Sequence, residues 1–178
     1  MVLTQAACEE LEGSMGSRRT LQMQFCFRAA ANGIRRSIQS PDRFPGCLAL
    51  MRQAERAFAL RRRDIGLVQV MCRQYSPTQC LGLHIDSVKL FDEPVLSVVL
   101  RCGSSDGLVL RKPGPWNDAT STFVDERPGL ATCLEGTARY EYGHEVPPVT
   151  ARRLSLTWRW FREEALDELL TNDSWESH

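Results

Sequence analysis

The sequence predicts an α+β protein that is mainly β, built as a sandwich or jelly roll with helices on one side. Three observations support this fold class. About seven short runs with β patterning, separated by turn residues, follow one another between residues 65 and 162. Helix-like stretches are instead concentrated in the first 60 residues. The length of 178 residues suits one domain with its own hydrophobic core.

The opening third predicts two helices with a strand between them. Leu3–Leu11 has the pattern of a short amphipathic helix, which Gly13–Ser17 should end because glycine and serine favour loops. Thr20–Phe27 alternates polar and apolar residues and predicts a strand or a strand-like flap. Leu48–Arg61 has apolar residues at spacings of three and four, which predicts a helix with one apolar face.

Beyond residue 65 the patterning is β. The predicted strands are Gly66–Tyr75, Cys80–Asp86, Pro94–Cys102, Leu108–Lys112, Ser121–Asp125, Leu130–Leu134 and Arg153–Phe161. A turn rich in glycine and serine joins the third of these to the fourth, so we expect the two to pair as a hairpin. Glu163–Leu170 predicts a short acidic helix. The chain thus divides into an N-terminal helical and lid-like region (1–64), a β core (65–162) and a C-terminal helix and tail (163–178).

Composition excludes several classes of protein. No apolar run approaches the roughly 20 residues of a membrane span. The N-terminus is acidic and lacks the basic segment of a secretory signal. The seven cysteines are scattered without a Cys-x-x-Cys pair, so we expect buried thiols in a reducing compartment rather than a disulfide scaffold or a zinc ribbon. These features predict a cytoplasmic or nuclear protein.

The net charge of zero hides an asymmetry along the chain. Up to Arg73 there are 12 arginines and no lysines against 6 acidic residues, a net charge of +6. The remainder carries 10 basic and 16 acidic residues, a net charge of −6. A basic first half can form a surface for nucleic acid or another polyanion. A solvated helix face explains the same charges equally well.

A histidine and a carboxylate, His84 and Asp86, stand two residues apart in a predicted strand. Such residues share one face, because strand side chains alternate. Apart from the C-terminal His178, the one other histidine is His144. Two histidines and one carboxylate are the ligand set of a non-heme Fe(II) facial triad, which leaves positions open for a co-substrate and dioxygen. His84, Asp86 and His144 are therefore candidate iron ligands, although a His-x-Asp pair alone is also common at protein surfaces.

The last predicted strand places two arginines on one face. Arg153 and Arg159 are six residues apart, and this even spacing puts them on the same side as Ser155 and Thr157. Inside a sandwich, two arginines would be costly without anions to pair with. The dianion 2-oxoglutarate, with a carboxylate at each end, would satisfy both. An exposed strand face with solvated arginines is the alternative.

The order of these motifs resembles the AlkB family of Fe(II)/2-oxoglutarate dioxygenases. This sequence and the family pattern both have a His-x-Asp pair, then a distant histidine, then two arginines separated by five residues on a terminal strand. The resemblance covers roughly residues 66–162. Four stretches carry it: Gln74–Pro77, similar to the end of the family's Asn-x-Tyr turn; Leu81–Leu100, similar to its His-x-Asp segment and next strand; Pro128–His144, similar to its Pro-Gly…Arg-Tyr…His stretch; and Arg153–Phe161, similar to its terminal strand.

The resemblance implies a double-stranded β-helix core, that is, a jelly roll, with Fe(II) held by His84, Asp86 and His144. It implies that Arg153, helped by Tyr75, binds the distal carboxylate of 2-oxoglutarate. Arg159 would reach the other end of this co-substrate, and Arg139 would have a structural role. The implied chemistry uses O2, converts 2-oxoglutarate to succinate and hydroxylates a C–H bond. From an N-methyl group the product loses formaldehyde.

The first 60 residues stand where the family keeps a substrate-recognition lid. If Thr20–Phe27 is part of such a lid, Phe25 or Phe27 could stack on a nucleobase, and ordinary core packing is the alternative for both. The expected substrate is a modified base in nucleic acid, with RNA favoured over DNA. An AlkB-like hydroxylase of a protein or small molecule is the second hypothesis, and a non-catalytic binding module on the same fold is the third.

Two positions depart from the family pattern. Arg73 stands where the Asn-x-Tyr turn has asparagine, which removes one expected hydrogen bond to 2-oxoglutarate or replaces it with a charge. Val88 stands two residues after the metal carboxylate, where the bacterial enzyme has an acid that contacts its methylated adenine. We therefore do not expect 1-methyladenine as the substrate.

Overall fold

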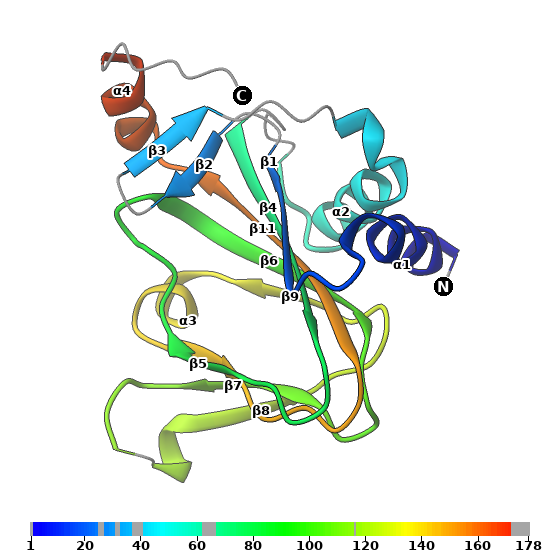
Figure 1. Cartoon of the computed structure of the whole chain (residues 1–178). Coiled ribbons are helices and arrows are strands. Elements are labelled where there is room, and N and C mark those ends of the chain that lie inside the picture. Colours follow the sequence, from blue (N-terminus) through cyan, green and yellow to red (C-terminus); the bar gives the residue numbers. More distant parts are fainter. Residues whose placement is uncertain are drawn as a thin grey trace.

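The fold consists of two facing antiparallel sheets with helices covering the outer side of the larger one (Figure 1). A computed structural model describes residues 2–24, 27–30, 33–36, 41–61, 67–115 and 117–171. The larger sheet has the order β1 (Thr20–Gln24), β4 (Val68–Tyr75), β11 (Arg153–Phe161), β6 (Phe91–Arg101) and β9 (Ala131–Leu134). The smaller has the order β5 (Leu81–His84), β10 (Gly143–Val146), β7 (Gly107–Arg111) and β8 (Ser121–Asp125). This arrangement confirms the predicted fold class.

The remaining elements lie around the two sheets. Strands β2 (Phe27–Ala30) and β3 (Gly33–Arg36) form a separate two-stranded ribbon. The helices are α1 (Val2–Met15), α2 (Pro45–Ala57), α3 (Gly136–Tyr140) and α4 (Glu163–Thr171), with short 3-10 turns η1 (Pro41–Arg43) and η3 (Asp118–Thr120). Among the described residues, no helix combines the length and the apolar character that crossing a membrane requires.

Strand β11 is the centre of the larger sheet, and its outward face builds the main core. Leu154, Leu156, Trp158 and Trp160 are between 0% and 4% exposed. They pack with apolar side chains of β4 and β6 and with one face of each of α1 and α2. Because strand side chains alternate, the intervening residues of β11 face the other sheet. The space between the sheets therefore receives the polar half of the strand.

Helices α1 and α2 are joined by a charged contact at the start of α2. The Glu10 carboxylate accepts hydrogen bonds from the backbone nitrogens of Gly46, at 2.5 Å, and Cys47, at 2.9 Å. A negative group is favourable there, because the first amides of a helix lack partners and carry partial positive charge. A Cβ on Gly46 would lie 3.1 Å from the Ala6 backbone, so glycine permits the close approach of the helices.

Several boundaries of helices and strands differ from those predicted from the sequence pattern. The predicted helix 48–61 begins earlier, at Pro45, because proline suits the first turn of a helix and Glu10 caps it. It also ends earlier than predicted, at Ala57. Helix α1 continues past Gly13 to Met15, whose side chain is buried in the core. The single strand predicted for Thr20–Phe27 is two elements, β1 and β2. Helix α3 and strands β10 and β3 were not predicted.

The predicted hairpin between the strands before and after Gly103–Gly107 is wrong. Strand β6 pairs with β11 and β9, whereas β7 pairs with β8 and β10 in the other sheet. The turn crosses between sheets because Asp106 holds it there. Its carboxylate accepts from the Gly103 nitrogen at 2.7 Å and from the Thr150 nitrogen at 2.7 Å. Contacts with a segment distant in sequence thus override the local hairpin signal.

Removing one core side chain of β11 should destabilise the fold markedly. We expect Leu156→Ala to lower the free energy of unfolding by about 2–5 kcal/mol, because Leu156 is 0% exposed and its loss leaves a cavity. Chemical denaturation followed by circular dichroism measures this change. Leu67→Ala is the matched control, since Leu67 is 37% exposed, and should cost less than about 1 kcal/mol. Equal losses for the two variants would contradict the assignment of the core.

Candidate metal and anion site

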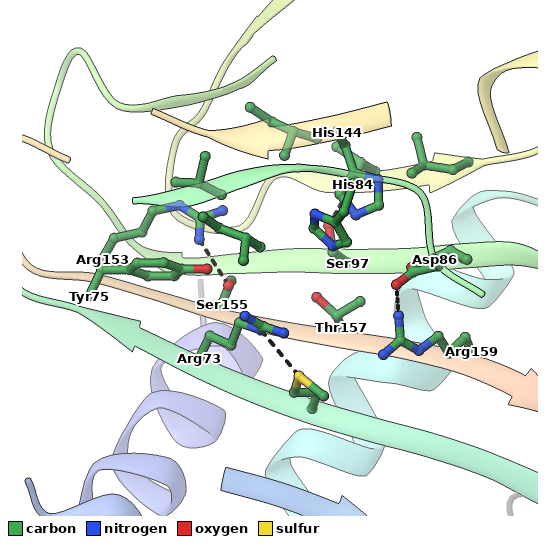
Figure 2. Close-up of a pocket in the computed structure, with 17 residues that line it drawn as sticks. Arg73, Tyr75, His84, Asp86, Ser97, His144, Arg153, Ser155, Thr157 and Arg159 are labelled. Carbon is green, nitrogen blue, oxygen red and sulfur yellow. Dashed lines mark hydrogen bonds and ion pairs between the residues drawn. The ribbon is translucent and has the colours of Figure 1, made fainter. Parts of the chain in front are cut away.

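The three predicted iron ligands come together at one end of the space between the sheets (Figure 2). His84 is the last residue of β5, and His144 lies opposite it on β10. Their ring centroids are 4.3 Å apart. One possible ligand atom from each of His84, Asp86 and His144 lies within 4.8 Å of the others. The structure therefore brings together residues that are up to 60 positions apart in the chain.

Asp86 reaches this cluster from a loop, not from the strand that the sequence predicted. Strand β5 ends at His84, and the following loop is held by the buried side chain of Arg139. The two terminal nitrogens of Arg139 donate to three backbone oxygens: Asp86 at 2.9 Å, Ser87 at 3.3 Å and Phe91 at 3.1 Å. The structural role expected of Arg139 thus takes a specific form, since it fixes the backbone that presents the carboxylate.

The electrostatic state of the cluster suits a divalent metal. Burial lowers the pKa of His84, and burial with the neighbouring His84 lowers the pKa of His144 to about 4. Both rings are therefore neutral near pH 7 and present lone pairs. The Asp86 carboxylate is 7% exposed; its Oδ1 pairs with Arg159, while its Oδ2 has no hydrogen-bond partner among the described residues. A buried carboxylate oxygen without a donor, beside two neutral imidazoles, fits the two-histidine, one-carboxylate set that binds Fe(II).

A cavity of about 60 Å³ extends from the cluster between the two sheets. One water needs roughly 10–15 Å³ of such space, so the cavity has room for a small polar molecule. Its floor is the inward face of β11 and β4, from which Arg73, Tyr75, Arg153 and Arg159 project (Figure 2). The predicted co-substrate residues Tyr75, Arg153 and Arg159 therefore line the same cavity as the three candidate ligands.

Arg153 is buried and Arg159 is largely buried, as the inward-facing interpretation required, but residues of the chain itself supply their anions. Arg153 forms a two-pronged pair with Glu126, with both nitrogen–oxygen distances at 2.8 Å. Arg159 pairs with Asp86 and donates to Gln69 at 2.8 Å. Burial would lower the pKa of Arg153, but the hydrogen bonds and charge of Glu126 outweigh it and raise this pKa. Burial and the charge of Arg73 lower the pKa of Arg159 to about 10.

Glu126 and Gln69 are partners that sequence reasoning missed. Glu126 directly follows β8 and is 4% exposed, and Gln69 lies on β4 and is 2% exposed. Neither belongs to a motif, so no local signal identified them. Arg73 lines the cavity between Tyr75 and the candidate metal ligands, and its Nε donates to the Met71 sulfur at 3.1 Å. It forms no ion pair with any acid in the described part of the chain.

Tyr75 lies beneath two cations. The guanidinium carbons of Arg153 and Arg19 are 5.3 Å and 5.8 Å from the centre of its ring. Burial raises the pKa of Tyr75 despite the nearby positive charges, so the phenol keeps its proton near pH 7 and can donate a hydrogen bond to an anion.

The two predicted lid residues stay predictions. Phe25 lies outside the described residues, and Phe27 begins β2 without a described side chain. Val88 is 43% exposed on the loop after the candidate ligand Asp86.

Comparison with known proteins supports the fold. No family model and no curated protein matches the chain. A crystal structure of a prolyl-4-hydroxylase from Pseudomonas putida is similar, with a TM-score of 0.55 and 16% identity over 91% of this chain and 87% of that one. A cupin domain from Bordetella pertussis aligns with a TM-score of 0.36 and 14% identity over 53% of this chain and 81% of that one. At 16% identity, the similarity to the prolyl-4-hydroxylase shows a shared fold, and the chemistry of the site has to be inferred from its own residues.

We expect Arg139→Lys to weaken metal binding about tenfold to a hundredfold, because lysine cannot donate from a planar fork to three carbonyls and the Asp86 loop would lose its support. Titration with Mn(II), followed by electron paramagnetic resonance on folded protein, measures the affinity. Arg56→Lys on the exposed side of α2 is the control. Unchanged Mn(II) affinity in Arg139→Lys would contradict the positioning role.

Proposed function

We propose that this protein is an Fe(II)- and 2-oxoglutarate-dependent oxygenase. The observation that carries the proposal is the convergence of His84, Asp86 and His144 within 4.8 Å at the end of an arginine-lined cavity. Two further facts support it. The motif order resembles the AlkB family, and the fold is similar to that of a prolyl-4-hydroxylase.

His84, Asp86 and His144 would hold Fe(II), which supplies the activation of O2 when bound. A guanidinium on the cavity floor that has no carboxylate partner in the described residues would hold a carboxylate of 2-oxoglutarate, with Tyr75 as a hydrogen-bond donor. In the overall reaction, 2-oxoglutarate, O2 and a substrate C–H group give succinate, CO2 and a substrate C–OH group. One oxygen atom enters succinate and the other enters the product.

The chain's own residues prepare this site in three ways. Burial keeps both histidines neutral, so that they present lone pairs rather than protons. Arg159 occupies one oxygen of Asp86 and leaves the other free. The two sheets restrict the cavity to a small volume, and electrostatic interactions are stronger where less water surrounds the charges.

For the substrate we propose a modified base in nucleic acid, with RNA favoured over DNA. The support is the resemblance of the run from His84 to Ser97 to AlkB family members that act on RNA, together with the net charge of +6 in the first 73 residues. On an N-methyl group, hydroxylation would release formaldehyde. A second candidate is a hydroxylase of a protein or a small molecule, because the fold and the ligand set bear on the oxidation chemistry more than on the substrate. A non-catalytic module is the third, and the complete ligand set in the described residues argues against it.

The protein should convert 2-oxoglutarate to succinate in the presence of Fe(II) and O2. We expect His84→Ala to reduce succinate formation to background while leaving the circular dichroism spectrum unchanged, because His84 is half-buried at a strand end and carries no core packing. Mass spectrometry of succinate measures turnover, and Arg56→Ala is the control. Equal succinate formation by His84→Ala and the unmodified protein would refute the metal assignment.

Bulk tRNA should stimulate succinate formation, and the stimulation should fall as salt concentration rises, because phosphate contacts release counterions. A pool of proline-containing peptides is the matched alternative substrate. Stimulation by the peptides alone would exclude nucleic acid in favour of a protein hydroxylase. Nucleoside mass spectrometry of the tRNA before and after reaction identifies the oxidised base.

A further inference from the structure

The charges around the cavity are unequally paired. Three guanidinium groups line it, and two of them already have carboxylate partners within the chain: Arg153 with Glu126, and Arg159 with Asp86. Arg73 forms no ion pair within the described ranges. A guanidinium between two sheets needs an anion more than one on the surface does, because the surroundings replace only part of its hydration. The cavity therefore has one cation available for a ligand.

Arg73 is placed to use that charge inside the cavity. It is on β4, directly opposite Ser155 of β11, and faces the same side as Tyr75. Figure 2 shows its guanidinium between the end of the cavity that holds Arg153 and Tyr75 and the end that holds Asp86 and Arg159. The hydrogen bond of its Nε to the Met71 sulfur is weak, since a thioether is a poor acceptor. A carboxylate would be a much better partner for the fork.

Arg153 is poorly suited to exchange partners. Its side chain and that of Glu126 are 4% and 1% exposed, and its third contact is with the Ser155 hydroxyl at 3.0 Å. Moving Arg153 to a ligand would leave the Glu126 carboxylate buried without a cation, which is strongly unfavourable. We therefore expect Arg153 to stay paired with Glu126 when a ligand enters the cavity.

We propose that Arg73 binds a carboxylate of the dianionic co-substrate in this protein, and that Arg153 remains paired with Glu126 as a structural unit of the cavity wall. The proposal rests on the proposed function and assigns a residue within that site. Arg73 stands where the Asn-x-Tyr pattern of the resembled family has asparagine. This position would therefore bind the co-substrate through a full positive charge here, instead of through an amide.

The test is calorimetric titration of 2-oxoglutarate into the Mn(II)-loaded protein, which requires no turnover. We expect Arg73→Met to weaken binding at least about tenfold, because a hydrogen bond to a charged group is lost. The affinity of Arg73→Lys for 2-oxoglutarate should lie between those of Arg73→Met and the unmodified protein, because lysine keeps the positive charge but lacks the planar guanidinium group. In the double variant Glu126→Leu/Arg153→Met both members of the buried pair are removed together, so no charge is left unpaired, and binding should stay within about threefold of the unmodified protein.

The outcomes separate the two levels of the proposal. Full affinity in Arg73→Met, or loss of binding in the double variant with Arg73 intact, would overturn the assignment of Arg73 while leaving the oxygenase function standing. No binding of 2-oxoglutarate to the unmodified, Mn(II)-loaded protein would overturn both. Arg56→Ala, with its side chain on α2 away from the cavity, is the control for general effects of removing an arginine.

Discussion

Strand β11 packs against other elements on both faces, and the two faces have opposite chemistry. Leucine and tryptophan side chains on one face join the sheet to α1 and α2, while Arg153, Ser155, Thr157 and Arg159 on the other face line the cavity. The first face supplies the apolar burial that stabilises the fold. The second places charge in the interior, where it must be paired. The arrangement of the site follows from this constraint.

The interior charges are paired in a way that leaves metal-binding capacity. Arg159 neutralises Asp86 through one oxygen only, and Arg139 holds the backbone of the same loop through three carbonyls. Asp86 is therefore buried, oriented and incompletely satisfied. Two histidines kept neutral by burial stand beside it. The Oδ2 atom of Asp86 is therefore the carboxylate oxygen that remains available for the proposed metal ion.

The jelly-roll fold and the chemistry of the site are separate kinds of support. The similarity to a prolyl-4-hydroxylase establishes how the sheets are arranged, and at 16% identity it says nothing of the substrate. The choice between a nucleobase and a protein side chain depends on the surface around the cavity mouth. Part of the N-terminal region that stands where a lid is expected, including Phe25, lies outside the described residues. The proposal for nucleic acid consequently rests on sequence motifs and charge.

The sequence by itself determined the features that depend on local periodicity. The alternation in Arg153–Phe161 predicted both the strand bounds and its two faces, and the His-x-Asp pair with a distant histidine predicted which three side chains come together. Only the tertiary structure decided which groups meet across the chain. It placed Asp86 on a loop held by Arg139, sent β6 and β7 to different sheets, and paired Arg153 with Glu126, 27 residues away. Side-chain period is set by neighbouring residues, whereas these contacts depend on how distant segments are brought together by the packing of the two sheets.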